Sequence, residues 1–210
     1  MWSIFDARTS VTLVALLLAM CTGVVGLLLL SRRPTPGAAE WGFGLLLYVA
    51  STMLLLIRQP RFDWLPLNIG IGLAVLTCML VLNGIHRWNG LTPSRRTLIF
   101  VPLTTLLVLN IVRVSLAPGH MDLAVSPAFT SVILGYAAGQ AWRSPGLEFC
   151  SRLLAVLAVV QVVRVGMYLI PPEPLLQIIL LLTLAALVMV QGIALYRAVA
   201  RRTEALNERS

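Results

Sequence analysis

Two pairs of polar side chains, each an amide three residues before an arginine, interrupt apolar stretches of this chain. Asn110 precedes Arg113, and Gln161 precedes Arg164. Residues three apart share one face of a helix, and a polar face turns away from lipid, which offers it no partners. A guanidinium presents a rigid fork of donors that suits a carboxylate or a phosphate. These pairs therefore predict binding of a small, acidic ligand.

A third arginine, Arg58, ends another apolar stretch at the same predicted depth, so we expect three guanidiniums to converge on one pocket. Asn68, at the start of the next stretch, completes the set of candidate ligand-binding residues. The competing hypothesis is local ion pairing, in which each arginine extends toward the interface. The acids available for this pairing lie in the links that follow: Asp63, Asp122 and Glu173. Both hypotheses remain open at this point.

Other chemistry is poorly represented in the sequence. There is no lysine, so a retinal Schiff base cannot form. His86 and His120 fall at opposite faces of the predicted bundle, which excludes haem binding by paired histidines. The three cysteines lack metal-ligand spacing, and we interpret them as small core residues: Cys21, Cys78 and Cys150. We expect no catalytic residues, no metal and no cofactor.

The elements that position these residues follow from the hydropathy of the chain. It has 210 residues, 59% of them hydrophobic and only 11% charged, with a mean hydropathy of +0.91. Soluble domains carry about 25% charged residues, so the expected solvent is a bilayer, and the expected fold is all-α. Seven stretches approach the length of about 20 residues that a spanning helix needs. They run approximately over Ser10–Leu30, Ala39–Ile57, Leu67–Ile85, Thr97–Leu116, Leu123–Trp142, Arg152–Ile170 and Pro174–Tyr196.

The arginines predict the orientation of this seven-helix bundle. Eleven lie in the links after the first, third, fifth and seventh stretches: Arg32, Arg33, Arg87, Arg95, Arg96, Arg143, Arg152, Arg197, Arg201, Arg202 and Arg209. Only Arg8, Arg58 and Arg61 lie on the opposite side. Cytoplasmic loops are enriched in arginine, so the N-terminus is expected outside and the C-terminus in the cytoplasm of a multi-pass membrane protein. The five tryptophans fall near the predicted interfaces, and we interpret them as membrane anchors.

The tail forms a separate unit in this interpretation. Residues 1–196 make the transmembrane domain, and residues 197–210 make a short cytoplasmic connector. Apolar and basic residues continue the last helix at heptad-like spacing: Leu195, Val199, Arg202 and Leu206. A helix of this pattern could pair with its twin in a homodimer. The alternative is a frayed, solvated helix end.

Several segments together resemble the N-terminal multi-spanning sensor region of bacterial diguanylate cyclases, the GGDEF proteins. The matching segments are Asp6–Thr9, Glu40–Gly44, Arg58, Asp63–Trp64, Asn68, Gly84–Gly90 and, as the connector, Arg202–Arg209. The resemblance implies a dimer in a bacterial inner membrane, whose last helix leads into a cytoplasmic cyclase that makes cyclic-di-GMP. Similar sensors also precede histidine kinases. No GGDEF sequence is present, so this chain itself should make no cyclic-di-GMP.

The sequence therefore predicts a membrane sensory domain that detects an extracytoplasmic or membrane-borne ligand, with the bilayer and a second copy as partners and no nucleic acid. One alternative is a small-molecule or lipid transporter, or a channel subunit. The Asn110–Arg113 pattern recurs weakly as Gln161–Arg164, and such internal repeats favour a transporter. The lack of an acidic residue in the middle of the membrane disfavours a transporter. A structural subunit of a larger membrane complex is a third hypothesis.

Overall fold

A computed structural model describes residues 4–32, 35–56, 64–92, 94–115, 121–169 and 174–208 of the chain. These residues form an all-α protein. Its seven helices are α1 (Ile4–Ser31), α2 (Ala38–Leu56), α3 (Trp64–Trp88), α4 (Arg95–Ser115), α5 (Met121–Trp142), α6 (Glu148–Leu169) and α7 (Pro174–Asn207). Each helix falls on one of the predicted apolar stretches. The last one runs without a break through the predicted domain boundary, so the described part of the connector is helical.

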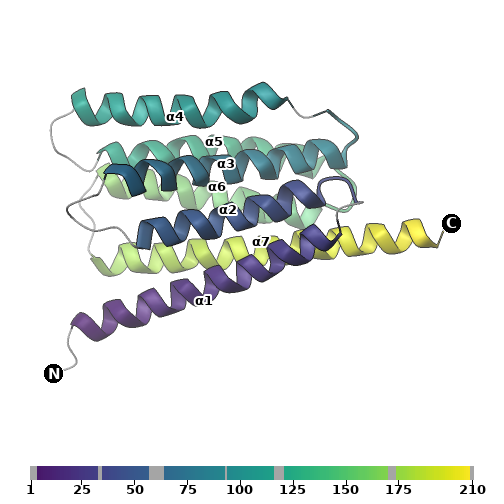
Figure 1. Ribbon diagram of the computed structural model, residues 1–210, viewed down its shortest axis with the longest axis horizontal. Coiled ribbons are helices and arrows are strands. Elements are labelled where there is room, and N and C mark those ends of the chain that lie inside the picture. Colours follow the sequence, from purple (N-terminus) through teal and green to yellow (C-terminus); the bar gives the residue numbers. More distant parts are fainter. Residues whose placement is uncertain are drawn as a thin grey trace.

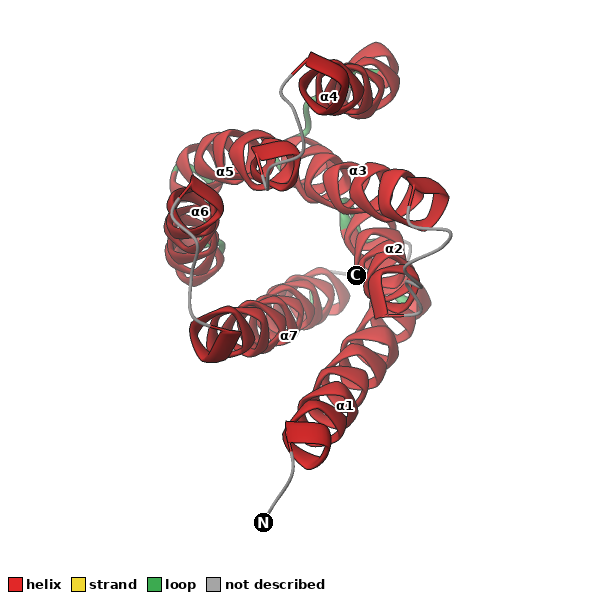
Figure 2. Cartoon of the chain, turned by 90° about the vertical axis from the view of Figure 1, so that its left-hand side faces the viewer, coloured by secondary structure: helices red, strands yellow, loops and turns green. Residues whose placement is uncertain are grey.

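The helices run side by side and alternate in direction (Figure 1). Viewed along their axes, six of them form a closed ring in the order α1, α2, α3, α5, α6, α7, and each contacts its two neighbours (Figure 2). Helix α4 lies outside this ring, against α3 and α5. We call the end of the bundle at which α1, α3 and α5 finish the basic end. Helix α7 extends past the other helices there (Figure 1).

Five helices are long and apolar enough to cross a membrane, judged over the described residues. These are α1, α3, α4, α6 and α7, whereas the apolar part of α2 is shorter, at Ala38–Leu54. Large apolar side chains on the outside of the ring are exposed, as Leu17, Phe100 and Val159 illustrate. A protein that exposes so much apolar surface is matched to lipid. The chain is therefore a multi-pass membrane protein.

Glycines set the distance between α1 and α2. A Cβ added to Gly42 would lie 2.8 Å from the carbonyl oxygen of Gly26, so only the missing side chains let these backbones approach. Lipid tails are as apolar as leucine, so close van der Waals packing of small residues drives association of helices in membranes. The same principle joins α5 to α6, where Ala137 and Ala141 are fully buried and Ser151 Oγ donates to Ala138 O at 2.8 Å.

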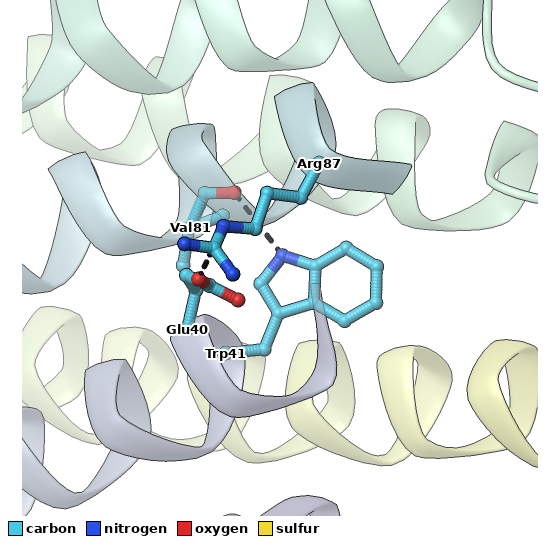
Figure 3. A network of polar contacts seen from close by, with 4 residues as sticks. All are labelled: Glu40, Trp41, Val81 and Arg87. Atoms are coloured by element: carbon cyan, nitrogen blue, oxygen red, sulfur yellow. Dashed lines mark hydrogen bonds and ion pairs between the residues drawn. The ribbon is translucent and has the colours of Figure 1, made fainter. Parts of the chain in front are cut away.

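Two tryptophans belong to the core of the basic end, which corrects their interpretation as membrane anchors. Trp41 is fully buried, and Trp88 is 7% exposed. Their ring centroids are 5.5 Å apart. Trp41 Nε1 donates to Val81 O at 3.1 Å, and beside it Glu40 pairs with Arg87 at 2.7 Å (Figure 3). These contacts fasten the start of α2 to the end of α3.

Candidate ligand-binding site

A cavity of about 210 Å³ lies among the six helices of the ring. Its walls are mainly leucine, alanine and valine side chains. The polar members of the lining come from α2, α3, α5, α6 and α7: Tyr48, Ser51, Thr52, Thr77, Ser126, Thr130, Gln161, Arg164 and Gln191. No residue of α4 lines it. A mainly apolar pocket with a few convergent polar groups is the usual form of a small-molecule site.

The predicted Gln161–Arg164 pair faces this cavity. Arg164 Nη1 donates to Gln161 Oε1 at 3.1 Å, and Gln161 is only 7% exposed. The amide oxygen thus accepts from the guanidinium and helps to fix its orientation. Arg164 is the charged residue of the described lining, which contains no carboxylate. An anionic group is therefore the ligand chemistry that this part of the cavity favours.

Gln191 on α7 is a cavity residue that the sequence analysis missed. Its side chain is 3% exposed, and neither Oε1 nor Nε2 has a hydrogen-bond partner among the described residues. A buried polar atom left without a partner costs about 1–3 kcal/mol. A ligand that both donates and accepts at this point would remove that cost. The available signal was a lone glutamine in the middle of an apolar helix, where polar side chains mark functional sites.

The hydroxyl groups of the lining mostly donate to backbone carbonyls. Ser51 Oγ donates to Gly70 O at 2.8 Å, Thr52 Oγ1 to Tyr48 O at 2.9 Å and Thr130 Oγ1 to Ser126 O at 2.9 Å. With its hydrogen used in this way, each hydroxyl can offer only an oxygen lone pair to the cavity. Arg164 and the Gln191 amide can donate to a bound acid, as can the Tyr48 hydroxyl and the NH2 group of Gln161, which also line the cavity.

The cavity is elongated along the bundle. Leu154 and Gln161 both line it from α6, and seven residues of helix span roughly 10 Å. Arg164 lies one turn further toward the end opposite the basic end, whereas Leu154 lies nearer the basic end. The shape suits a narrow, mainly apolar molecule with an acid group at its Arg164 end.

The structure places the other predicted pair elsewhere. Asn110 Nδ2 donates to Asn68 Oδ1 at 3.1 Å and to Leu106 O at 2.7 Å, so these two amides join α4 to α3 outside the ring. Arg113 is exposed on α4 and does not line the cavity. The expected convergence of Arg113 and Arg164 on one pocket is therefore not observed, because a helix outside the ring cannot reach its interior.

The remaining candidates lie outside the described residues. Arg58, Asp63 and Glu173 fall in segments whose structure is not described, and the side chain of Asp122 is likewise outside the description. The hypothesis of local ion pairing thus stays a prediction. Among the described residues, no cluster of histidine, cysteine, aspartate or glutamate could hold a metal ion.

Comparison with protein-family models, with curated proteins and with solved structures finds no significant match to this chain. The resemblance to the sensor regions of diguanylate cyclases therefore rests on the segments quoted above.

Proposed function

We propose that this chain is the ligand-binding domain of a membrane receptor and that α7 carries its signal out of the bilayer. One observation carries the proposal. Helix α7 lines the cavity through Gln191 and continues without a break to Asn207, past the end of the bundle. A ligand that moves Gln191 must move the same rigid helix that leaves the membrane.

The arrangement in the membrane that accompanies this proposal has seven spans, with the N-terminus outside and the basic end in the cytoplasm. The arginine distribution supports this orientation. The effector proposed for α7 is a cytoplasmic diguanylate cyclase, through which ligand binding would change the level of cyclic-di-GMP. The sequence resemblance supports that choice, and pairing of the last turns of α7 with a second copy would supply the dimer that such an effector needs.

The ligand proposed for the cavity is a narrow, mainly apolar molecule with an acid group. The acid binds Arg164, and the apolar body occupies the space lined by residues such as Leu157 and Leu184. A polar group further along the molecule satisfies the buried amide of Gln191. A ligand shifts a conformational equilibrium only through its difference in affinity for two states, and the unpaired amide on α7 supplies such a difference.

At the basic end, two contacts define the position of α7 relative to the ring, and a signal that moves α7 would act on them. Thr203 Oγ1 lies 2.9 Å from Thr35 Oγ1, which precedes α2. Arg202 Nη1 donates to Trp88 O, at the end of α3, at 3.0 Å. If α7 slides or rotates, these two contacts either persist or break. Their state therefore reports the position of α7 relative to the ring.

The experiment uses 8-hydroxyoctanesulfonate as the probe, an eight-carbon chain with a permanent negative charge for Arg164 and a distal hydroxyl for the amide of Gln191. Spin labels at Glu204→Cys and Thr97→Cys, in a chain with its three cysteines replaced by alanine, measure the distance between α7 and α4 in lipid nanodiscs. Saturating 8-hydroxyoctanesulfonate should shift the distance distribution in this chain. The probe should leave the distribution unchanged in the Arg164→Gln variant, and octyltrimethylammonium should leave it unchanged in the unaltered chain. A probe that binds without any shift would contradict the signalling role.

The cavity within a ring of helices also favours the transporter hypothesis, which makes a different prediction. A transporter should move radiolabelled octanesulfonate into proteoliposomes at a rate that depends on Arg164. A receptor should bind the probe without moving it, so that uptake equals the uptake into protein-free liposomes. Saturable uptake would replace the receptor proposal with the transporter.

A further inference from the structure

A second, separate concavity lies at the basic end. It is an open groove of about 870 Å³ between the end of α3, the turn joining α5 to α6, and α7. Among the described residues, three arginines line it, Arg143, Arg201 and Arg202, and no acidic residue does. It shares no lining residue with the cavity that contains Gln191, so the two concavities are distinct.

Two of these arginines have hydrogen bonds that restrict their positions. The Arg202 guanidinium lies 4.3 Å from the centroid of the Trp88 ring while it donates to Trp88 O. Arg201 Nε donates to Arg197 O at 3.4 Å, one turn earlier on α7. Side chains held in place lose less conformational entropy when an anion binds. Arg202 is thus held in place by two contacts, and Arg201 is restrained by one long hydrogen bond, so part of this cationic surface is pre-arranged.

An adjoining groove of about 350 Å³ runs between α6 and α7 and shares Gly146 and Arg201 with the first. Its other walls include Phe149, Val190 and Ile193, and the first two of these are exposed on the apolar outer surface. A polar, basic groove and an apolar groove therefore meet at Arg201. This combination matches the two parts of a phospholipid, a phosphate-bearing headgroup and an acyl chain.

We propose that this double groove is a binding site for an anionic phospholipid. The phosphate binds Arg201 and Arg143, and one acyl chain lies between α6 and α7. Basic pockets between membrane helices are a known form of recognition for anionic headgroups, and planar guanidiniums bind phosphate oxygens in pairs. Because Arg201 and Arg202 belong to α7, the lipid would also hold the helix that leaves the bundle. This site does not depend on the receptor proposal.

Acidic side chains next to the groove define its limits. Glu148 accepts a hydrogen bond from Gly146 N at 3.2 Å. The positive charges of Arg201 and Arg152 both interact with its carboxylate. Glu204 is exposed one turn beyond Arg201. Glu148 thus offsets part of the positive charge on the α6 side, whereas Arg143 lies on the turn across the groove. Arg152 lines neither groove and provides a matched control.

The test measures binding of dioctanoylphosphatidylglycerol to the purified chain in neutral detergent by native mass spectrometry. Dioctanoylphosphatidylcholine should bind at least fivefold more weakly. Each of Arg201→Gln and Arg143→Gln should lower the phosphatidylglycerol affinity about fivefold, the value expected for one arginine near an anionic surface. Arg152→Gln should change it less than twofold. Equal affinity for the two lipids, or an equal loss in the Arg152 variant, would overturn the proposal.

Two further arms separate a lipid from a soluble phosphate compound. Glycerol 3-phosphate at the lipid's concentration should fail to displace the lipid, and Val190→Trp, which fills the apolar groove, should weaken lipid binding more than Val159→Trp on the open face of α6. Full displacement of the lipid by glycerol 3-phosphate, or equal effects of Val190→Trp and Val159→Trp on lipid binding, would show that the site does not recognise a lipid. Only variants whose thermal midpoints match that of the unaltered chain are compared. If Arg201→Gln fails to fold, Arg201→Lys replaces it and should still weaken phosphatidylglycerol binding measurably, because an ammonium cannot bind two phosphate oxygens as a guanidinium does; unchanged affinity in this variant would count against the proposal.

Discussion

Arg202 contacts Trp88 in two ways, since its guanidinium carbon lies 4.3 Å from the ring centroid and its Nη1 donates to the backbone carbonyl at 3.0 Å. Trp88 Nε1 in turn donates to Pro145 O at 3.3 Å. One arginine on α7 is therefore linked to the end of α3 and, through the indole, to the turn before α6. This connection holds the last turns of α7 against the bundle.

Replacing Arg202 by glutamine should destabilise the folded chain by about 1–3 kcal/mol, because both the cation–π contact and a charge-assisted hydrogen bond are lost. The midpoint of an SDS unfolding titration measures the change. Arg202→Lys should recover only part of it, since an ammonium cannot stack as a planar fork does. The exposed Arg152→Gln serves as the control. Equal midpoints for the two glutamine variants would show that the contact contributes nothing.

Replacing Gly84 by alanine should destabilise the fold by about 1–3 kcal/mol through overpacking. The added Cβ would overlap Nε1 of Trp41, whose indole is fully buried and cannot move aside. Gly139→Ala is the matched control, because a Cβ there meets nothing within 4 Å. The control should be neutral or raise stability by up to about 1 kcal/mol, as alanine favours helix. A neutral Gly84 variant would refute the close packing of α2 on α3.

Replacing Gln191 by leucine should raise the stability of the ligand-free chain by about 1–3 kcal/mol, because a buried amide without partners is removed. The same variant should bind octanesulfonate no more weakly, since the sulfonate binds at Arg164. Thermal unfolding in nanodiscs measures the stability, with Gln140→Leu on α5, outside the cavity, as the control. If Gln191→Leu destabilises the chain and Gln140→Leu does not, Gln191 has a hydrogen-bond partner within the protein.

Asn68 and Asn110 should couple to each other and not to the cavity. A double-mutant cycle with Asn68→Ala and Asn110→Ala should give an interaction energy of about 0.6 kcal/mol, the average for side-chain hydrogen bonds between membrane helices. Neither variant should alter octanesulfonate binding more than twofold. Additive effects on stability, or a large loss of binding, would place these amides in a different role.

The sequence was sufficient for the helices, because seven continuous apolar stretches leave few other ways to satisfy the backbone in lipid. It also identified the inward-facing Gln161–Arg164 pair, since polar groups at one helical face avoid lipid. It could not show that α4 lies outside the ring. In the similar motif on α4, Asn110 contacts Asn68 of α3 outside the ring. The order of helices in a bundle depends on packing between distant segments rather than on local pattern.

Two further features depended on tertiary packing. Trp41 and Trp88 occur where an aromatic belt is expected, yet the absence of a side chain at Gly84 makes room to bury the first of them in the core. Gln191 has no charged neighbour in sequence that would single it out. Its importance comes from the cavity it faces and from the helix that carries it out of the bundle.

Arg164, inside the ring, should bind an acidic ligand, whereas Arg113, outside it, should not. Equilibrium binding of radiolabelled octanesulfonate to nanodiscs, corrected for protein-free discs, measures this difference. We predict saturable binding to the unaltered chain. Arg164→Gln should weaken this binding at least tenfold, as expected for a charge-assisted contact of about 1.5–3 kcal/mol, and Arg113→Gln should change it less than twofold. Equal losses in the two variants, or no saturable binding to the unaltered chain, would show that the cavity does not bind an acid through Arg164.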